Sequence, residues 1–265
     1  MPYLSNGEGC SIPREGQAIE EEAVSTAQAG GNELDLQQWV DRLKDRDPGR
    51  RAHAAAVLGA FGPRAKPALP ALLEALKDRA PEVRRKATTA LREIGAEARI
   101  TIPALMSALQ DKDELVRRRA IAALGELGPE ARMATAALIQ LLSDENSLLR
   151  RWAAAALGEI GPTAPSAIPA LIEALRETDV KNRAVTAAAL RKMGIRAVPR
   201  LIEALRHHDA NVRRHAAQTL AKNPAGRDAI PVLRALLKDP DLHVAEAASE
   251  ALRLFETEAA NENGK

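Results

Sequence analysis

The sequence repeats itself with a period of about thirty-three residues, and three consecutive copies align without a gap. These copies span 71–103, 104–136 and 137–169, and each places a leucine and, four residues later, a glycine at the same positions. A fixed period in this range is typical of a solenoid, in which each unit buries its apolar face only against its neighbours. The sequence therefore predicts a repeat array rather than one globular core.

Less regular copies flank these three, and we expect about seven in all. Residues 1–33 contain Gly, Ser and Glu in place of the apolar pattern, which predicts a disordered acidic leader. The predicted array covers 34–255 and a polar tail covers 256–265. Repeats are expected at about 38–70, 71–103, 104–136, 137–169, 170–199, 200–231 and 232–255.

Each unit carries two apolar stripes with helical spacing, separated by a turn. In the copy at 71–103 the turn is Asp78–Pro81. Gly95 follows the second stripe, where a helix often ends in a left-handed conformation. Pro103 is expected in the first turn of the next helix, which can spare a backbone N–H. Each unit is therefore predicted to be a helical hairpin. The second stripe, spaced as a buried helical face, consists of Val83, Ala87, Ala90, Leu91 and Ile94.

Composition supports an all-α protein, because aromatic residues make up only 2% of the chain while Ala, Leu, Glu and Arg abound. The net charge of +2 is unevenly placed: the leader carries one arginine against six glutamates, or −5, which leaves +7 for the rest. The single cysteine, Cys10, excludes an internal disulfide. No apolar run resembles a signal peptide or a membrane span. We therefore expect a soluble, cytoplasmic protein.

The repeated pattern A-L-(I/L)-x-A-L-x-D-x(5)-R-R-x-A-x-x-A-L-x-x-(I/L)-G resembles the HEAT-like repeats first grouped around phycobilin lyases. The resemblance covers residues 38–255. It implies an α-solenoid, a right-handed superhelix of helical hairpins whose second helices line the concave side. Members of this family range from scaffolds to lyases, hydroxylases and glycosylases, so the resemblance says more about fold than about function.

An acidic residue and an arginine recur six positions apart within the repeats. We expect each acid, at the turn between the two helices, to bond the arginine or the backbone of an adjoining repeat; an anion-binding ladder is the alternative. The pattern is expected to break near the C-terminus, where His207 replaces the acid and Ala245 the arginine. The members of this structural ladder are Asp45 and Arg51, Asp78 and Arg84, Asp111 and Arg117, Asp144 and Arg150, and Glu177 and Arg183.

A second set of arginines lies one position further along each second helix. Successive helical residues are about 100° apart, which puts positions 85, 89 and 92 opposite the buried stripe. Small residues should keep this surface open, so that guanidinium groups can bind carboxylates or phosphates. An ordinary solvated face, partly neutralised by Glu93, Glu126 and Glu159, is the alternative. Trp152 is either an interface anchor or a filler between repeats. The predicted partner-binding residues are Arg85, Thr89, Arg92, Arg118, Arg151, Trp152, Arg191 and Arg214.

The sequence shows no enzyme signature. None of the five histidines is followed by Glu, and none forms the i, i+4 pair of a helical zinc site. A phosphate-cradling glycine loop and a nucleophile elbow are also missing. We therefore predict no catalytic residue, no metal and no cofactor.

These observations favour a non-catalytic scaffold or adaptor that binds a protein or peptide partner, with an acidic segment, along the second helices. Two alternatives stay open. A nucleic-acid-binding protein is favoured by the +7 repeat region and opposed by the small net charge. A bilin lyase or lyase-chaperone subunit is implied only by the resemblance. The leader also suggests internal competition, with Glu20–Glu22 occupying the arginine row in place of a partner.

Overall fold

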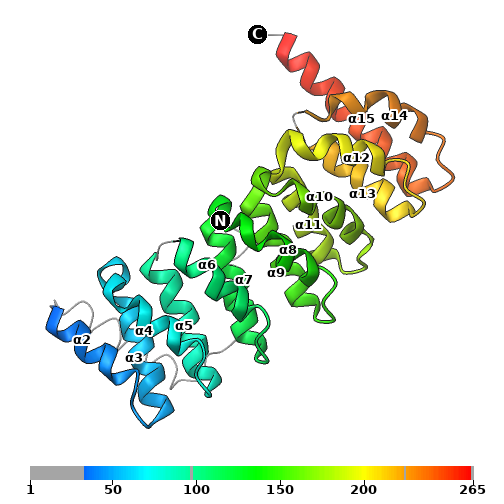
Figure 1. The fold of residues 1–265 in the computed structure, drawn as a ribbon. Coiled ribbons are helices and arrows are strands. Elements are labelled where there is room, and N and C mark those ends of the chain that lie inside the picture. Colours follow the sequence, from blue (N-terminus) through cyan, green and yellow to red (C-terminus); the bar gives the residue numbers. More distant parts are fainter. Residues whose placement is uncertain (1–32, 96–97, 224, 264–265) are drawn as a thin grey trace. The chain divides into compact units, whose positions relative to one another are not determined.

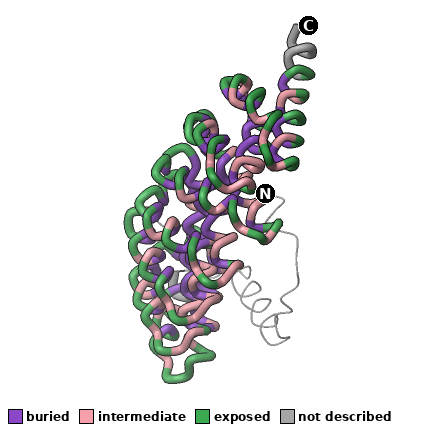
Figure 2. Tube along the Cα trace, turned by 90° about the vertical axis from the view of Figure 1, so that its right-hand side faces the viewer, coloured by how far each residue is buried: buried purple, intermediate pink, exposed green. Residues whose placement is uncertain are grey.

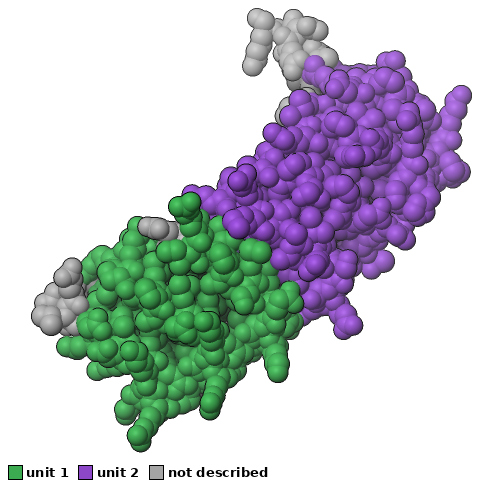
Figure 3. All heavy atoms as spheres, viewed as in Figure 1, with its two compact units in different colours: residues 1–119 green, residues 120–265 purple. Residues whose placement is uncertain are grey.

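The structure, a computed structural model, describes residues 33–95, 98–223 and 225–263. Every regular element within these ranges is an α-helix or a 3-10 helix (Figure 1). The chain divides into two compact units, residues 1–119 and 120–265 (Figure 3). The leader predicted over 1–33 lies outside the described residues except for Glu33, where the first helix begins.

The first unit is built from helices that alternate between two roles. First helices of the hairpins are short, and second helices are longer and pack against the second helix of the next hairpin, as α3 does against α5. The elements are α2 (Glu33–Arg42), α3 (Pro48–Ala60), η1 (Gly62–Ala68), α4 (Leu69–Ala75), α5 (Pro81–Ile94), α6 (Ala98–Ala108) and the start of α7 (Glu114–Leu127).

The second unit continues the alternation, with α9 against α11 and α13 against α15. Helix α15 extends well beyond Phe255, so residues 256–263 of the predicted polar tail are helical. The elements are η2 (Gly128–Ala134), α8 (Thr135–Leu141), α9 (Ser147–Ile160), η3 (Gly161–Thr163), η4 (Pro165–Ala167), α10 (Ile168–Glu173), η5 (Ala174–Arg176), α11 (Val180–Lys192), η6 (Gly194–Ala197), α12 (Val198–Ala204), α13 (Ala210–Ala221), η7 (Gly226–Ala229), α14 (Ile230–Leu236) and α15 (Leu242–Asn263).

The buried residues form the predicted stripes. On α5 all five members of the stripe at 83–94 are buried, and they pack with Leu58 and Leu72 in the core of the first unit. Figure 2 shows buried positions along the helix sides that face one another and exposed positions at the turns. Since the first helix of each hairpin is short, burial depends on the neighbouring hairpins, as expected of a repeat array.

The helix end at Gly95 lies where the sequence predicts, whereas Pro103 occupies a different position in its helix from the one predicted. Gly95 caps α5 in the left-handed region with φ 61°, as expected. Pro70 is the second residue of α4, as expected, but Pro103 lies inside α6 instead of in its first turn. The prediction for Pro103 is therefore wrong: α6 starts early, at Ala98, where other repeats insert a 3-10 segment. The ring of Pro103 is exposed, so it displaces no core residue.

Small residues let adjacent second helices approach closely. A Cβ added to Gly158 of α9 would lie 2.8 Å from the Cα of Ala189 on α11. The corresponding distance from Gly125 of α7 to the Cα of Ala156 on α9 is 3.2 Å. These approaches leave no room for large side chains and account for the scarcity of aromatic residues. None of the described helices combines the length and apolarity that crossing a bilayer requires.

Candidate protein-interaction surface

The first arginine of each second helix spans two repeats. Arg84 of α5 donates from Nε and Nη2 to both carboxylate oxygens of Asp111 in the next repeat, at 2.6 and 2.7 Å. Its Nη1 donates to the carbonyl oxygen of Asp78 in its own repeat, at 2.9 Å. Asp78 also accepts the N–H of Ala80 through its side chain, at 2.9 Å. One guanidinium group thus forms hydrogen bonds to the turn of its own repeat and to the turn of the next repeat.

The same geometry recurs in both units. The acid of each pair is the turn residue of the following repeat, 26 or 27 positions beyond the arginine. The arginine's hydrogen bonds lower the pKa of the Asp78, Asp111, Glu177 and Asp239 carboxyls, against the raising effect of burial. The bidentate pairs are Arg51 with Asp78, Arg84 with Asp111, Arg150 with Glu177 and Arg213 with Asp239.

The remaining members of the ladder use backbone groups. Asp45 accepts Arg51 through its carbonyl oxygen, at 2.9 Å, and Asp144 accepts Arg150 in the same way, at 2.8 Å. Arg117 donates to the carbonyl oxygen of Asp111 at 2.8 Å. Each of these bonds closes a turn within one repeat.

Arg183 is the incomplete member of the ladder. Its Nη1 donates to the carbonyl oxygens of Glu177 and Thr178, while its buried Nε has no acceptor among the described residues. The place of the next acid is taken by His207, whose Nδ1 accepts the N–H of Asp209 at 3.1 Å. The histidine therefore preserves the turn but supplies no carboxylate to Arg183.

The arginines among the predicted partner-binding residues form what we call the arginine row: Arg85, Arg92, Arg118, Arg151, Arg191 and Arg214. Two of them are bound by the next repeat. Arg85 of α5 forms a bidentate ion pair with Asp113, with Nε 2.8 Å from Oδ1. This pair lowers the pKa of Asp113 to about 2, with a smaller contribution from the N–H of Val116. Arg151 of α9 donates from Nε to the Oδ1 of Asn182 at 2.7 Å, and its Nη2 lies 3.4 Å from Asp179.

The other arginines of the row are less constrained. Arg118 forms no hydrogen bond or ion pair within the described part of the first unit, and Arg191 forms none within that of the second. Arg214 of α13 donates from Nη2 to Asn211 and to the imidazole of His215, at 3.0 and 3.1 Å. Its Nε is buried without an acceptor among the described residues. Among the described residues of its own unit, none of these three guanidinium groups has a carboxylate partner.

The predicted neighbours of these arginines lie on the same helices. Thr89 of α5 donates its hydroxyl to the carbonyl oxygen of Arg85 and contacts Arg119. Arg92, one turn on, is exposed and lies 3.6 Å from Glu93. Trp152 is half-buried on α9. In the first unit α5 therefore brings Arg85, Thr89 and Arg92 together, and α7 carries Arg118. In the second unit the remaining predicted residues lie on α9 (Arg151 and Trp152), α11 (Arg191) and α13 (Arg214).

The sequence interpretation missed five residues of these networks. Four of them accept from an arginine of the preceding repeat, and Arg213 is a donor in the register of Arg84. For three of the acceptors the signal was a shared register, because Asp113 and Asp179 occupy equivalent turn positions and Asp239 occupies that of Asp78. Asn182 is buried where the other repeats place Val83, Val116 or Leu149, which marks it as a departure from the pattern. The missed residues are Asp113, Asp179, Asn182, Arg213 and Asp239.

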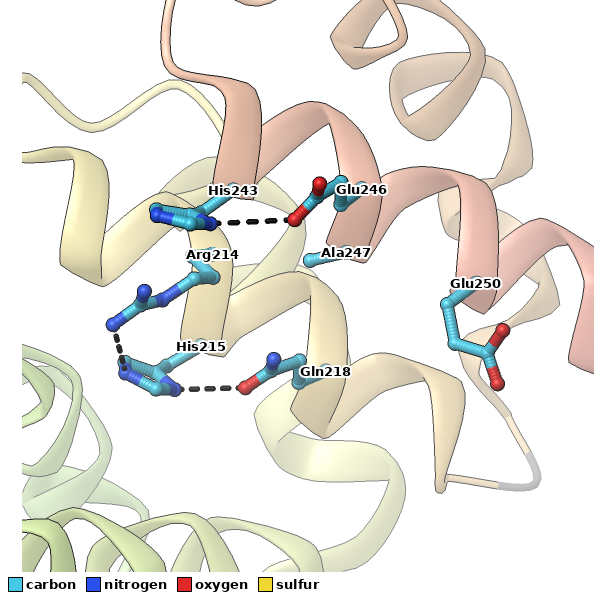
Figure 4. Close-up of a pocket in the computed structure, with 7 residues that line it drawn as sticks. All are labelled: Arg214, His215, Gln218, His243, Glu246, Ala247 and Glu250. Carbon is cyan, nitrogen blue, oxygen red and sulfur yellow. Dashed lines mark hydrogen bonds and ion pairs between the residues drawn. The ribbon is translucent and has the colours of Figure 1, made fainter.

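A cavity opens between α13 and α15 in the second unit (Figure 4). Its volume is about 310 Å³. The lining residues are Arg214, His215 and Gln218 from α13 and His243, Glu246, Ala247 and Glu250 from α15. No group of three metal-ligating side chains occurs among the described residues. The cavity is therefore lined by charges rather than by a metal-ligand set.

Solved structures share the fold. An engineered protein aligns with a TM-score of 0.58 at 22% identity, over 96% of this chain and 77% of that one. Kap95p, in a structure of Kap95p binding to RanGDP, aligns with a TM-score of 0.66 at 15% identity, over 92% of this chain and 38% of that one. In the complex of CpcE and CpcF of phycocyanin lyase from Nostoc sp. PCC7120, the aligned chain is 26% identical with a TM-score of 0.49, over 86% and 96%.

Sequence comparison identifies the repeats themselves. No curated protein matches the chain. A family model of HEAT repeats matches residues 36–102, 102–191 and 198–262, and a model of the PBS lyase HEAT-like repeat matches residues 183–207. The first of these covers most of the chain and the helical hairpins fit it, so the chain belongs to the family of HEAT-repeat proteins.

Proposed function

We propose that this protein is a non-catalytic scaffold that binds an acidic segment of a protein partner along its second helices. The proposal is carried by the contrast within the arginine row. Arg85 and Arg151 are bound to acceptors in the next repeat, whereas Arg118, Arg191 and Arg214 have no carboxylate partner among the described residues of their own unit. A cation that the fold does not neutralise is available to a carboxylate of a partner.

The HEAT repeats and the fold shared with Kap95p, a chain that binds RanGDP, support a role in protein binding. Surface arginines contribute to interfaces both by hydrogen bonding and by packing their planar groups. We therefore expect the partner to present aspartate or glutamate side chains spaced along an extended segment.

Charge reversal separates binding from folding. In Arg118→Glu/Arg191→Glu, affinity capture from native lysate followed by mass spectrometry should lose the partners that the wild type retains, with an unchanged melting temperature. The matched control is Arg99→Glu/Arg196→Glu, because both arginines are exposed and lie on α6 and η6, off the second helices. Identical partner lists for all three proteins would refute an arginine-dependent surface.

A further inference from the structure

The cavity between α13 and α15 contains Arg214, which does not bind the acid that the next repeat places in its register. Arg85 binds Asp113, and Arg151 reaches Asp179. The residue in the same register for Arg214 is Asp241, whose carboxylate accepts the backbone N–H groups of His243 and Val244. Arg214 instead lies along the cavity, bonded to neutral groups of its own helix.

His215 holds Arg214 in this position. A guanidinium group can only donate, so the Nε2 of His215 accepts a hydrogen bond from Arg214. The proton of the imidazole is therefore on Nδ1, which donates to the Oε1 of Gln218 with an N–O distance of 2.8 Å. Burial lowers the pKa of His215 and outweighs the raising effect of the hydrogen bond to Gln218, while the charges of Arg214 and Arg183 also lower it. The imidazole is therefore neutral, and the charge of Arg214 is oriented without being neutralised.

The opposite wall has the reverse charge. Glu246 and Glu250 of α15 occupy the register of Arg85 and Thr89, so the row of arginines ends in carboxylates in the last repeat. Glu246 lies 3.2 Å from the Nδ1 of His243, and Glu250 accepts two bonds from Arg253 at 2.7 and 2.9 Å. Both glutamates are exposed. Figure 4 shows Arg214 and His215 on α13, and His243, Glu246 and Glu250 on α15.

We propose that this cavity docks a partner segment that presents an acidic and a basic side chain next to each other, the acid on Arg214 and the base on Glu246. A single charge of either sign meets repulsion from one wall, whereas a pair of opposite charges meets attraction from both. A volume of about 310 Å³ is at the small end of ligand sites and suits side chains of a segment. This inference rests on the proposed scaffold function, of which it names one contact.

The direct test uses three capped dipeptides: acetyl-Glu-Arg-amide, acetyl-Gln-Arg-amide and acetyl-Glu-Gln-amide. Each is titrated into the full chain at about pH 8, where an ordinary histidine is neutral, and the imidazole NMR signals of His215 and His243 are followed. The doubly charged peptide should bind about two- to fivefold more tightly than either singly charged one, as expected for exposed ion pairs. Equal affinities for the three, or unmoved imidazole signals, would overturn the proposal.

Variants locate the two charges. Arg214→Gln should remove the advantage of Glu over Gln in the peptide, and Glu246→Gln the advantage of Arg over Gln. Matched controls are Arg200→Gln and Glu203→Gln, which break a comparable exposed ion pair on α12, outside the cavity. Controls that behave like the cavity variants would mean that the peptide binds elsewhere, and would also overturn the proposal.

Partner capture distinguishes this inference from the scaffold function. If the wild type captures partners that Arg214→Gln/Glu246→Gln also captures, and the doubly charged peptide shows no preference, the cavity proposal fails while the scaffold stands. If the wild type captures none, the scaffold function fails, and the peptide titration alone then decides whether the cavity binds paired charges. A preference seen in the wild type and lost in the double variant supports the cavity proposal.

Discussion

Two adjacent arginines on each second helix perform different tasks. Arg84 closes its own turn through the carbonyl of Asp78 and binds Asp111 of the next repeat, so its removal would disturb two repeats at once. Arg85 reaches Asp113 with a larger part of its side chain exposed. Charge-assisted bidentate pairs of this kind give orientation as well as energy. At the scale of residues, the ladder therefore sets the register between neighbouring hairpins.

Acid should weaken the Arg85–Asp113 pair. The folded pKa of Asp113 is about 2, below the unfolded value of about 3.9, so its contribution to stability is fully present above about pH 5 and is lost as the pH falls through about 2. We expect Asp113→Asn to cost about 1 kcal/mol at neutral pH, a value reduced for solvent exposure. Asparagine can still accept the N–H groups of Val116 and of Arg85 Nε through its Oδ1, so the variant keeps the turn and removes the charge together with the acceptor of Arg85 Nη2.

The measurement is the difference in melting temperature between wild type and Asp113→Asn as a function of pH. Taking the difference cancels the other carboxyls whose pKa is lowered in the same direction. The difference should be constant above about pH 5 and shrink toward pH 2. A difference that persists unchanged to pH 2 would show that the ion pair does not stabilise the fold.

Restoring the missing acid should stabilise the second unit. Arg183 has a buried Nε without an acceptor among the described residues, because His207 stands where the other repeats place Asp or Glu. In His207→Asp, a carboxylate can still accept the N–H of Asp209 and can also bind Arg183, which outweighs the loss of the contact between His207 Nε2 and the exposed Glu173. We expect a gain of about 1 kcal/mol, or roughly 2–4 °C in melting temperature.

The matched control for this substitution is His208→Asp. His208 is the exposed neighbour of His207, so the control adds the same charge without the register of the ladder. Its melting temperature should remain close to that of the wild type. If His207→Asp gains nothing over His208→Asp, the incomplete pair costs the fold no stability.

The sequence predicted which residues belong to the ladder better than it predicted which of them pair with each other. The six-residue spacing of Asp78 and Arg84 singled out both residues, but the carboxylate that Arg84 binds is 27 positions away. Spacing within a repeat cannot say how far a repeat is displaced from the next, and that displacement decides the pairing. The direction of Arg85 followed from the helical wheel, whereas its engagement with Asp113 depends on the reach of a long side chain.

At the scale of elements, the periodicity of the sequence predicted the helices and the glycines that end them, but it did not predict the 3-10 segments. Such segments as η1 and η2 carry no apolar period of their own, so the helix-spacing argument could not reveal them. Pro103 was misplaced for a related reason: proline is compatible with an early position in a helix, but it does not say which turn comes first.

The close approach of second helices gives a prediction that opposes intrinsic propensity. Alanine is about 1 kcal/mol better than glycine within a helix, yet a Cβ at Gly158 would lie 2.8 Å from the Cα and 2.9 Å from the Cβ of Ala189. Overpacking of this kind costs about 1–3 kcal/mol. Gly158→Ala should therefore lower the melting temperature, because α9 and α11 must move apart.

Gly125→Ala is the graded comparison. Its added Cβ would lie 3.2 Å from the Cα and 3.3 Å from the Cβ of Ala156, so a small adjustment can relieve the contact and the propensity gain can offset it. We expect this variant to remain close to wild type in thermal melts. A Gly158→Ala protein that is as stable as Gly125→Ala would show that the helices are not limited by this contact.

At the scale of the whole molecule, the period determines the fold, and we expect function to lie in the positions that depart from it. Repeats with equivalent Leu91, Leu124 and Leu157 specify a HEAT-repeat array without reference to any ligand. The sequence showed the change of charge at this register, with Glu246 where Arg85 stands, but not the cavity beside Arg214, which depends on that side chain bonding within its own helix rather than to Asp241.

The uneven charge of the chain yields the last prediction. Residues 1–33 carry a net −5 and the remainder +7, so the leader is expected to compete with an acidic partner for the arginines. Deletion of residues 1–32, which keeps Glu33 at the start of α2, should tighten binding of a glutamate-rich peptide about two- to fivefold at low salt. The gain should fade as salt shortens the screening length to below about 10 Å. The length-matched control replaces Glu20, Glu21 and Glu22 with Gln and should reproduce part of the gain, because the competition depends on charge. Equal affinity of the full and shortened chains, measured by calorimetry at low salt, would exclude the leader as an internal competitor.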